Sequence, residues 1–296
     1  MLLCGGMIGI AAPQAHAELI VGVSLFGELV TFDSAAPSII INRRAISGLT
    51  GQAQGEAISA IDYRPANGKL YALGNAPGSL YRLYTLDIST GVATRVGATD
   101  YTTFSGTFFG FDFNPQVDRI RVVSDGETNV RLNPNDGTLA GTDTAITPAG
   151  DLVAVAYDRN DNVNTTLTTL YGIDATSDSL VRVGGLDGIP SPNDGAVTTV
   201  GPLGVNTTGR VSFDISSNTG LAYAALTFNG TEGQVSSLYT VNLLTGTASL
   251  IGPIGDGSEA LRALSVQVIP EPSSVGLLVV AGGMLVARRR RGLRED

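Results

Sequence analysis

The sequence lacks most of the side chains that carry out covalent and metal chemistry in proteins. Its single cysteine, Cys4, and its single histidine, His16, both lie within the first 17 residues. The rest of the chain therefore offers no disulfide, thiol nucleophile, Ser-His-Asp triad, or histidine or cysteine ligand for zinc or haem. Lys69 is the only lysine, which argues against Schiff-base chemistry. These absences predict a protein without a resident cofactor and without catalytic residues of these kinds.

Positive charge and tryptophan are also scarce. Asp and Glu number 27 against 18 Lys and Arg, and the formal net charge is −9. Because nucleic-acid phosphates need a basic surface, an acidic chain is not expected to bind nucleic acid. No glycine-rich phosphate-binding loop is present either. The absence of tryptophan removes the best surface for stacking against sugars and leaves only tyrosines such as Tyr63, Tyr81, Tyr84 and Tyr101.

The N-terminal segment has the character of a signal peptide. Residues 1–17 form a short apolar run that ends in Ala15-His16-Ala17, and signal peptidase cleaves after small residues in the positions of Ala15 and Ala17. We therefore expect export of the chain and removal of this segment by signal peptidase. No lysine or arginine precedes the apolar run, so a start further upstream is also compatible with the sequence.

The C-terminal segment, residues 269–296, has three consecutive parts. Pro270-Glu271-Pro272 comes first, an apolar stretch follows at 275–287, and Arg288 to Arg291 come next. As a helix the apolar stretch spans about 20 Å, less than the ~30 Å hydrocarbon core of a bilayer, unless flanking residues extend it. The arginines are expected to stay on the cytoplasmic side, which places the upstream chain outside.

This arrangement resembles the PEP-CTERM sorting signal of Gram-negative bacteria that make exopolysaccharide. The resemblance implies transient membrane insertion of the tail and recognition by an exosortase-type membrane protease. It further implies cleavage near Pro270, Glu271 and Pro272, with delivery to the cell surface or extracellular matrix. An ordinary C-terminal membrane anchor is the alternative.

Between these two segments, residues 18–268 repeat a pattern of short β-strands. With 38 glycines and few charged residues, this composition suits short strands joined by tight turns. A hairpin pattern occurs at 79–97, 169–184 and 236–252. A second strand type recurs about every 50 residues, at 57–65, 108–115, 152–159, 210–216 and 261–268. Repeats of this length, with several strands in each, are typical of a β-propeller.

The count of units predicts how the ring closes. Four complete units begin at residues 57, 108, 152 and 210, but the strand at 261–268 has no further strands after it. Its missing partners are expected at the N-terminal end, at 19–25, 28–33 and 39–46. The sequence therefore predicts an all-β, five-bladed propeller whose last blade joins both ends of the chain and leaves no free sheet edge. A solenoid is the alternative, disfavoured because neither end has a polar capping unit.

One segment resembles a bacterial family of domains of unknown function. The resemblance rests on G-F-D-F-N-P at 110–115, D-R-I-R-V-V-S at 118–124 and N-x-R-L-N-P-x-x-G at 129–137. It is strong in this segment and weaker over the rest of 19–268. It implies a propeller-like secreted domain and supplies no catalytic residues, because the family has no assigned activity.

Aspartates recur at one position of the repeated strand. The aligned residues of the five units are Asp62, Asp112, Ala156, Asp214 and Ser265. Paired carboxylates hydrolyse glycosides when they lie about 5 to 9.5 Å apart and one has a raised pKa. Aspartates that precede Asn-Pro or Arg-Pro and then a turn are also typical of turn stabilisation. We favour the turn interpretation of Asp62, Asp112 and Asp214, since repeated residues usually serve the repeat.

Several loops offer oxygen ligands for calcium. They lie at 125–127, 133–137 and 158–162, but none matches the EF-hand or the nonapeptide calcium repeat. Ordinary turns rich in Asp and Asn are the favoured interpretation, and no metal ligand is predicted. Four tyrosines within strands are expected to pack between blades: Tyr71, Tyr84, Tyr171 and Tyr239.

The sequence thus predicts an exported, non-enzymatic protein with a binding or structural role at the cell surface or in the extracellular matrix, with exopolysaccharide as a candidate partner. The alternative is a carboxylate-dependent glycoside hydrolase acting on extracellular polysaccharide. Ligand contacts are expected in the loops that differ between units, at 158–168 and 185–208.

Overall fold

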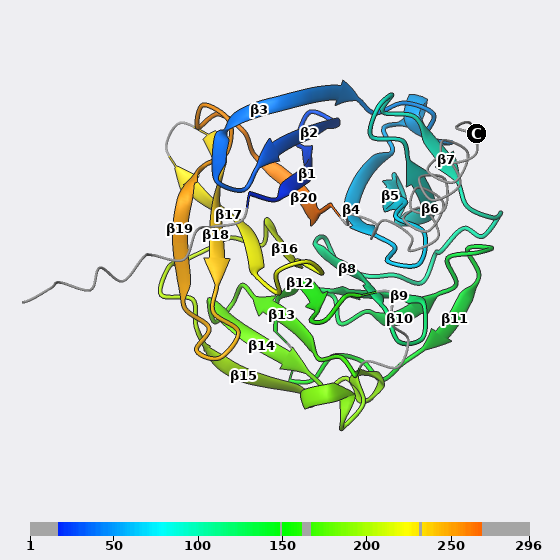
Figure 1. Ribbon diagram of the computed structural model, residues 1–296. Coiled ribbons are helices and arrows are strands. Elements are labelled where there is room, and N and C mark those ends of the chain that lie inside the picture. The colour runs from blue at the N-terminus through cyan, green and yellow to red at the C-terminus, as the bar shows by residue number, and fades with distance from the viewer. Residues whose placement is uncertain (1–16, 149, 162–166, 231–232, 268–296) are drawn as a thin grey trace, which may run out of the picture.

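The computed structural model describes residues 17–148, 150–161, 167–230 and 233–267. They form five four-stranded antiparallel sheets arranged around a central axis (Figure 1). The predicted five-bladed β-propeller is confirmed. Ala15 and the motif at 270–272 lie outside the described residues, as does the apolar stretch at 275–287. Within the described part of the chain, no helix has both the length and the apolarity of a membrane span.

Each blade has its four strands in order from the axis to the rim. The innermost strands are β4 (Ala57–Tyr63), β8 (Phe109–Asn114), β12 (Leu152–Tyr157), β16 (Val211–Ile215) and β20 (Leu261–Val266). The second strands are β5 (Leu70–Ala76), β9 (Arg119–Ser124), β13 (Leu170–Asp174), β17 (Ala222–Gly230) and β1 (Leu19–Ser24). The third strands are β6 (Leu80–Leu86), β10 (Asn129–Leu132), β14 (Ser179–Val183), β18 (Gly233–Val241) and β2 (Glu28–Asp33). The outer strands are β7 (Ala93–Arg95), β11 (Leu139–Thr142), β15 (Val197–Pro202), β19 (Ala248–Pro253) and β3 (Ala36–Ala45).

Short 3₁₀ turns complete the connections; they are η1 (Gln52–Gln54), η2 (Leu186–Gly188) and η3 (Pro192–Asp194). The closing blade combines both ends of the described chain, as predicted. Strand β20 pairs antiparallel with β1, and Val266 lies opposite Ile20. Because β20 is the inner strand of a blade whose other strands come from the N-terminal end, the ladder joins residues far apart in sequence. This closure gives β20 its ladder partner and completes the fifth four-stranded sheet.

The repeated hairpins end in the same type of turn. In the blade of β4, Asp87 Oδ1 accepts hydrogen bonds from the N–H groups of Ser89 at 2.8 Å and Thr90 at 3.1 Å. The N–H of Gly91 donates to the Asp87 carbonyl at 2.7 Å, and Gly91 has a φ of 77°. Only glycine adopts this left-handed conformation without a steric cost, which explains the glycine at this point of the turn, and Gly246 in the blade of β16 also has a positive φ, of 84°.

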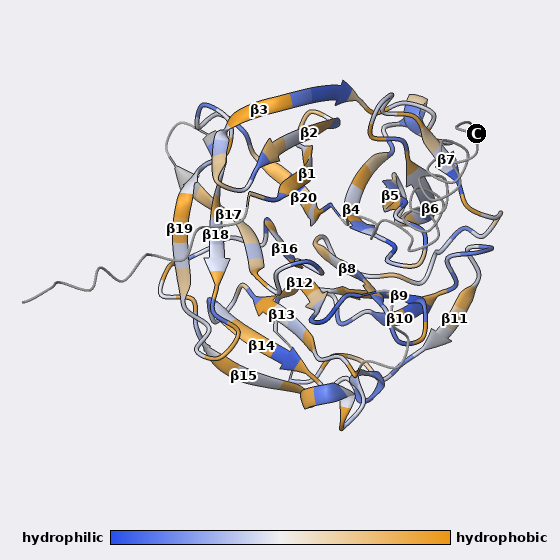
Figure 2. Cartoon of the chain, viewed as in Figure 1, coloured by the Kyte–Doolittle hydropathy of each residue, from blue (hydrophilic) through white to orange (hydrophobic). Residues whose placement is uncertain are grey.

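The hydrophobic core lies between neighbouring blades. The inner strands carry long apolar runs, whereas the end of β3 at the rim is hydrophilic (Figure 2). One cluster joins β4 to β6 with β1 and β2, and another joins the blade of β4 to that of β8. The predicted packing of four tyrosines between blades is confirmed, because each belongs to such a cluster: Tyr71, Tyr84, Tyr171 and Tyr239.

The tyrosines considered for sugar stacking are buried as well. Tyr63, Tyr81, Tyr84 and Tyr101 all lie in the core. Tyr101 stacks on Phe104 with ring centroids 5.0 Å apart. Because their faces contact other apolar side chains, these rings are not available to a carbohydrate, and that part of the sequence interpretation is wrong.

Candidate functional site

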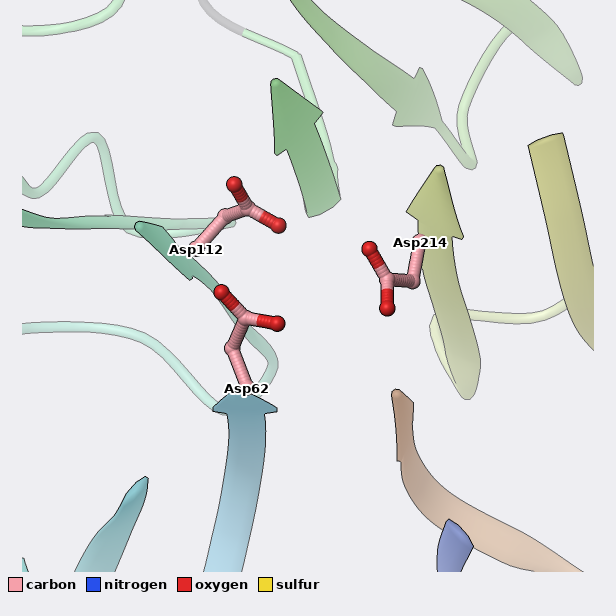
Figure 3. Close-up of side chains that lie close together, drawn as sticks. All are labelled: Asp62, Asp112 and Asp214. Carbon is pink, nitrogen blue, oxygen red and sulfur yellow. The ribbon is translucent and has the colours of Figure 1, made fainter. Parts of the chain in front are cut away.

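The three repeated aspartates converge at the centre of the propeller. Asp62 lies on β4, Asp112 on β8 and Asp214 on β16, and the three side chains point toward one another (Figure 3). One carboxylate oxygen from each lies within 4.8 Å of those from the other two. Their exposed fractions are 1%, 1% and 4%. Three carboxylates from distant parts of the chain therefore share one small buried volume.

These aspartates belong to a layer in which a side chain of one blade accepts a hydrogen bond from the backbone of the next blade. Asp62 Oδ2 accepts from the N–H of Phe113 at 2.8 Å. Asp112 Oδ1 accepts from the N–H of Tyr157 at 3.1 Å. Each carboxylate thus satisfies a backbone donor that would otherwise be buried without a partner.

The same layer continues through the other blades. Asp214 Oδ2 accepts from the N–H of Val266 at 2.6 Å, and Ser265 Oγ accepts from the N–H of Tyr63 at 3.3 Å. In β12 the equivalent residue is Ala156, whose methyl group cannot accept. The five positions are those that the repeat aligns in the sequence, and four of them bind the next blade.

The interpretation of these aspartates as turn residues is wrong. They lie inside strands, and the N–H groups that they bind also belong to strands or strand ends. In the blade of β8 the turn is stabilised instead by Asn114, whose Oδ1 accepts from the N–H of Gln116 at 3.0 Å. Asp112, two residues earlier, lies within β8, and its side chain points toward Asp62 and Asp214 (Figure 3).

Ser265 joins two of the carboxylates directly. Its Oγ lies 2.9 Å from Asp62 Oδ1 and 2.9 Å from Asp214 Oδ2. A hydroxyl has one proton to donate, so it cannot donate fully to both carboxylates. A proton on one of the two carboxyl groups would supply the second hydrogen bond.

Burial and mutual repulsion make the cluster hard to ionise. Burial raises the pKa of Asp214 to about 6. Burial, followed by the charge of Asp214, raises the pKa of Asp62 well above its usual range. The pKa of Asp112 is raised by burial and by the charges of both other aspartates. Carboxylates this close bind a proton or a cation in preference to remaining fully charged.

The cluster could hold a hard cation through its carboxylate oxygens, as calcium sites do. Several of these oxygens already accept backbone and hydroxyl donors. The loops considered for calcium use their oxygens in a similar way. Asp125 Oδ1 accepts from the N–H of Thr107 at 2.7 Å, and Asp158 Oδ1 accepts from the N–H of Thr169 at 2.6 Å.

A second feature lies at the opening where the inner strands begin. A pocket of about 170 Å³ is lined by Ser59, Asn75, Thr107, Phe108, Phe109, Val153, Arg210, Val211 and Arg262. Deeper in the channel, between this pocket and the aspartates, the free volume falls to about 20 Å³. That is close to the space needed by a single water molecule. The channel thus has an open, arginine-lined end and a closed, acidic layer.

Sequence reasoning missed this pocket. The sequence feature that could have revealed it is an arginine at each of two inner strands: Arg210 directly before β16 and Arg262 within the mostly apolar strand β20. Neither residue recurs in the other units, so the repeat did not draw attention to them. The loops at 158–168 and 185–208 do not contribute to this pocket, but residues of both, Thr168 and Asn193 among them, line a separate pocket of about 290 Å³.

Several solved structures are similar to this chain. They include TolB from Acinetobacter baumannii, at 12% identity and TM-score 0.43, with 80% of this chain and 52% of that chain covered. A putative 6-phosphogluconolactonase from Bacteroides fragilis has 15% identity and TM-score 0.40, with 83% and 69% covered. An engineered GH43 glycoside hydrolase has 13% identity and TM-score 0.48, with 87% and 55% covered. At these values the similarity concerns the fold alone.

No curated protein matches the sequence. Residues 28–265 match the family model described as Domain of unknown function (DUF4394), in agreement with the resemblance seen in the motifs at 110–137. Since this match covers most of the chain and nearly the whole propeller, the chain belongs to the DUF4394 family of domains of unknown function.

Proposed function

We propose that the protein is an exported binding module of the cell surface or extracellular matrix, and that it carries its ligand at the arginine-lined end of the propeller channel. The observation that carries this proposal is the pocket formed by residues from all five inner strands around a nearly closed channel. Concave sites with a few polar groups among apolar walls are the usual form of a ligand site.

The acidic layer supports binding in preference to glycoside hydrolysis. Hydrolysis needs two carboxyl groups on opposite sides of a sugar, about 5 to 9.5 Å apart. Here the carboxylate oxygens lie within 4.8 Å of one another, and Asp62 and Asp112 are 99% buried. Their hydrogen bonds to neighbouring blades give them a structural role, which a hydrolase mechanism does not require.

Binding and hydrolysis are separated by one pair of measurements on the full chain. Co-sedimentation with insoluble acidic and neutral polysaccharides measures retention, and release of reducing ends measures cleavage. We expect retention without release of reducing ends, and Asp112→Asn should leave retention unchanged. Cleavage that is lost in this variant would establish the hydrolase alternative and contradict the proposal.

Export rests on the sequence features at both ends of the chain, with signal peptidase and an exosortase-type protease as processing partners. Deletion of residues 275–296 should move the protein from the membrane or cell-surface fraction to the periplasm or medium. Fractionation and immunoblotting of producing cells measure this. An unchanged distribution would contradict the sorting role of the tail.

A further inference from the structure

Two arginines at the mouth of the channel have no acidic partner among the residues that the structure describes. Of the ion pairs in the described part of the chain, none includes Arg210 or Arg262. The Nε atom of Arg262 is buried and has no hydrogen-bond partner. The guanidinium of Arg210 lies 5.9 Å from the ring centroid of Phe108. Unpaired guanidinium groups inside a pocket are unusual, because arginine in such places is normally paired with an anion.

The two positive charges also act on each other. Burial, and then the charge of Arg210, lower the pKa of Arg262. The acidic layer does not compensate them, since Ser265 follows Arg262 by three residues and therefore lies about 10 Å away along the strand. A bound anion would relieve both the unsatisfied donors and the mutual repulsion.

The rest of the pocket suits an oxyanion. Ser59, Asn75 and Thr107 line it, and no hydrogen bond engages their side chains within the described residues. Just below, Ser212 Oγ is buried without a partner, and Ser212 has an exposed fraction of 6%. Phe108, Phe109 and Val153 supply apolar walls, which strengthen hydrogen bonds to a charged group by excluding water.

The pocket size limits the ligand. Its volume of about 170 Å³ is below the 300 to 1,000 Å³ of sites for drug-sized molecules. A compact anion or the charged end unit of a longer chain therefore fits better than an internal stretch of polymer. Guanidinium groups bind carboxylate and sulfate through two parallel hydrogen bonds.

We propose that this pocket binds the oxyanion group, carboxylate or sulfate, of an acidic sugar unit, with Arg210 and Arg262 as its principal ligands. The sugar part rests on the proposed function as a matrix-binding module, whereas the anion site does not depend on it. Arg262 is the central residue, since it borders both the pocket and the narrow channel beneath it.

Calorimetric titration of the full chain tests the site with glucuronate, inorganic sulfate and glucose. Wild-type protein should bind glucuronate and sulfate but not glucose, and Arg262→Gln should weaken both anions by at least about 10-fold. Arg210→Gln with Arg262→Gln should abolish binding. The control Arg44→Gln removes an exposed arginine bound to backbone carbonyls and should have no effect. Equal anion binding by wild type and the double variant, or no anion binding by wild type, would overturn the proposal.

Further measurements distinguish a failure of this anion site from a failure of the proposed function. Thermal unfolding without ligand should show that Arg262→Gln folds, and sulfate should raise the unfolding temperature of wild type more than that of the variant. Glucuronate binding at the pocket, with no retention on immobilised polygalacturonate, would support the anion site and reject polysaccharide binding. Retention on polygalacturonate that is equal in wild type and the double variant would support the function and reject this site.

Discussion

The substitution Asp112→Asn tests whether the acidic layer is held together by protons. Of the three aspartates, Asp112 has the fewest hydrogen bonds to stabilise a negative charge. It accepts one backbone hydrogen bond, from Tyr157 at 3.1 Å. Asp62 accepts from two backbone groups and from Ser265. Asparagine has nearly the same shape, keeps an oxygen for the Tyr157 N–H, and adds an NH₂ donor that can face a neighbouring carboxylate.

The expected gain follows from the geometry. Two ionised carboxylates 4.8 Å apart repel by roughly 3.5 kcal/mol at an effective dielectric constant of about 20. Asp112→Asn removes this repulsion from both neighbours at once. We therefore expect the free energy of unfolding to rise by about 2 to 4 kcal/mol at pH 7.5, which is a substantial fraction of the stability of an ordinary domain.

The sign of the pH dependence follows from the raised pKa values. A carboxyl group whose pKa is higher in the folded state binds a proton on folding, so its contribution is fully present at low pH and is lost as the pH rises. For Asp214, with a pKa of about 6, the loss runs from about pH 4 to pH 6. Asp62 and Asp112 have pKa values that are also raised, and they add to this loss. Wild type and variant should thus be similar at pH 4 and diverge above it.

Guanidinium chloride unfolding at pH 4, 6 and 7.5, in buffers with and without a chelator, measures the difference. Far-UV circular dichroism is the suitable signal, because the chain has no tryptophan. The difference between variant and wild type at each pH cancels the contribution of the other acidic groups to the free energy of unfolding. A variant less stable than wild type at pH 7.5, together with a wild type destabilised by the chelator, would refute the protonated layer and indicate a bound cation.

Two further substitutions test contacts within a blade and between blades. Arg121 and Asp143 form an ion pair with side chains 3% and 5% exposed, so Arg121→Ala should lower the free energy of unfolding by about 3 to 5 kcal/mol. Arg131, 32% exposed and bound to the same carboxylate, is the matched control. Arg131→Ala should lower the free energy of unfolding by much less. A Cβ atom on Gly110 would lie 2.7 Å from the backbone nitrogen of Val155, so Gly110→Ala should destabilise by about 1 to 3 kcal/mol. Gly252→Ala, where the nearest atom is 3.5 Å away, should be nearly neutral, and equal effects in denaturant unfolding would contradict the close approach of β8 and β12.

Much of the fold could be predicted because it follows from local sequence patterns that repeat along the chain. Strand alternation, the turn ending in Gly91 and the interval of about 50 residues are all properties of short segments. Closure by β1 and β20 followed from counting, since an inner strand at 261–268 needed partners. Packing of Tyr71 and Tyr84 between blades followed from their place in the strands.

The candidate site could be predicted only in part. The repeat aligned Asp62, Asp112 and Asp214, but the same local sequence fits a turn equally well. What separates the two interpretations is the direction in which each side chain points and the N–H group that it meets, and these belong to the next blade. The arginine pair was missed because Arg210 and Arg262 are far apart in sequence and occur once each.

The sequence by itself determined the blades and their number, because their strands and turns depend on residues close together in the chain. The closure of the ring followed from the count of these units. Only the tertiary structure decided that three aspartates share a buried layer and that two unpaired arginines share a pocket. Both features arise where inner strands from separate units meet at one axis. Their charges depend on distances across that axis, which no segment of the sequence specifies alone.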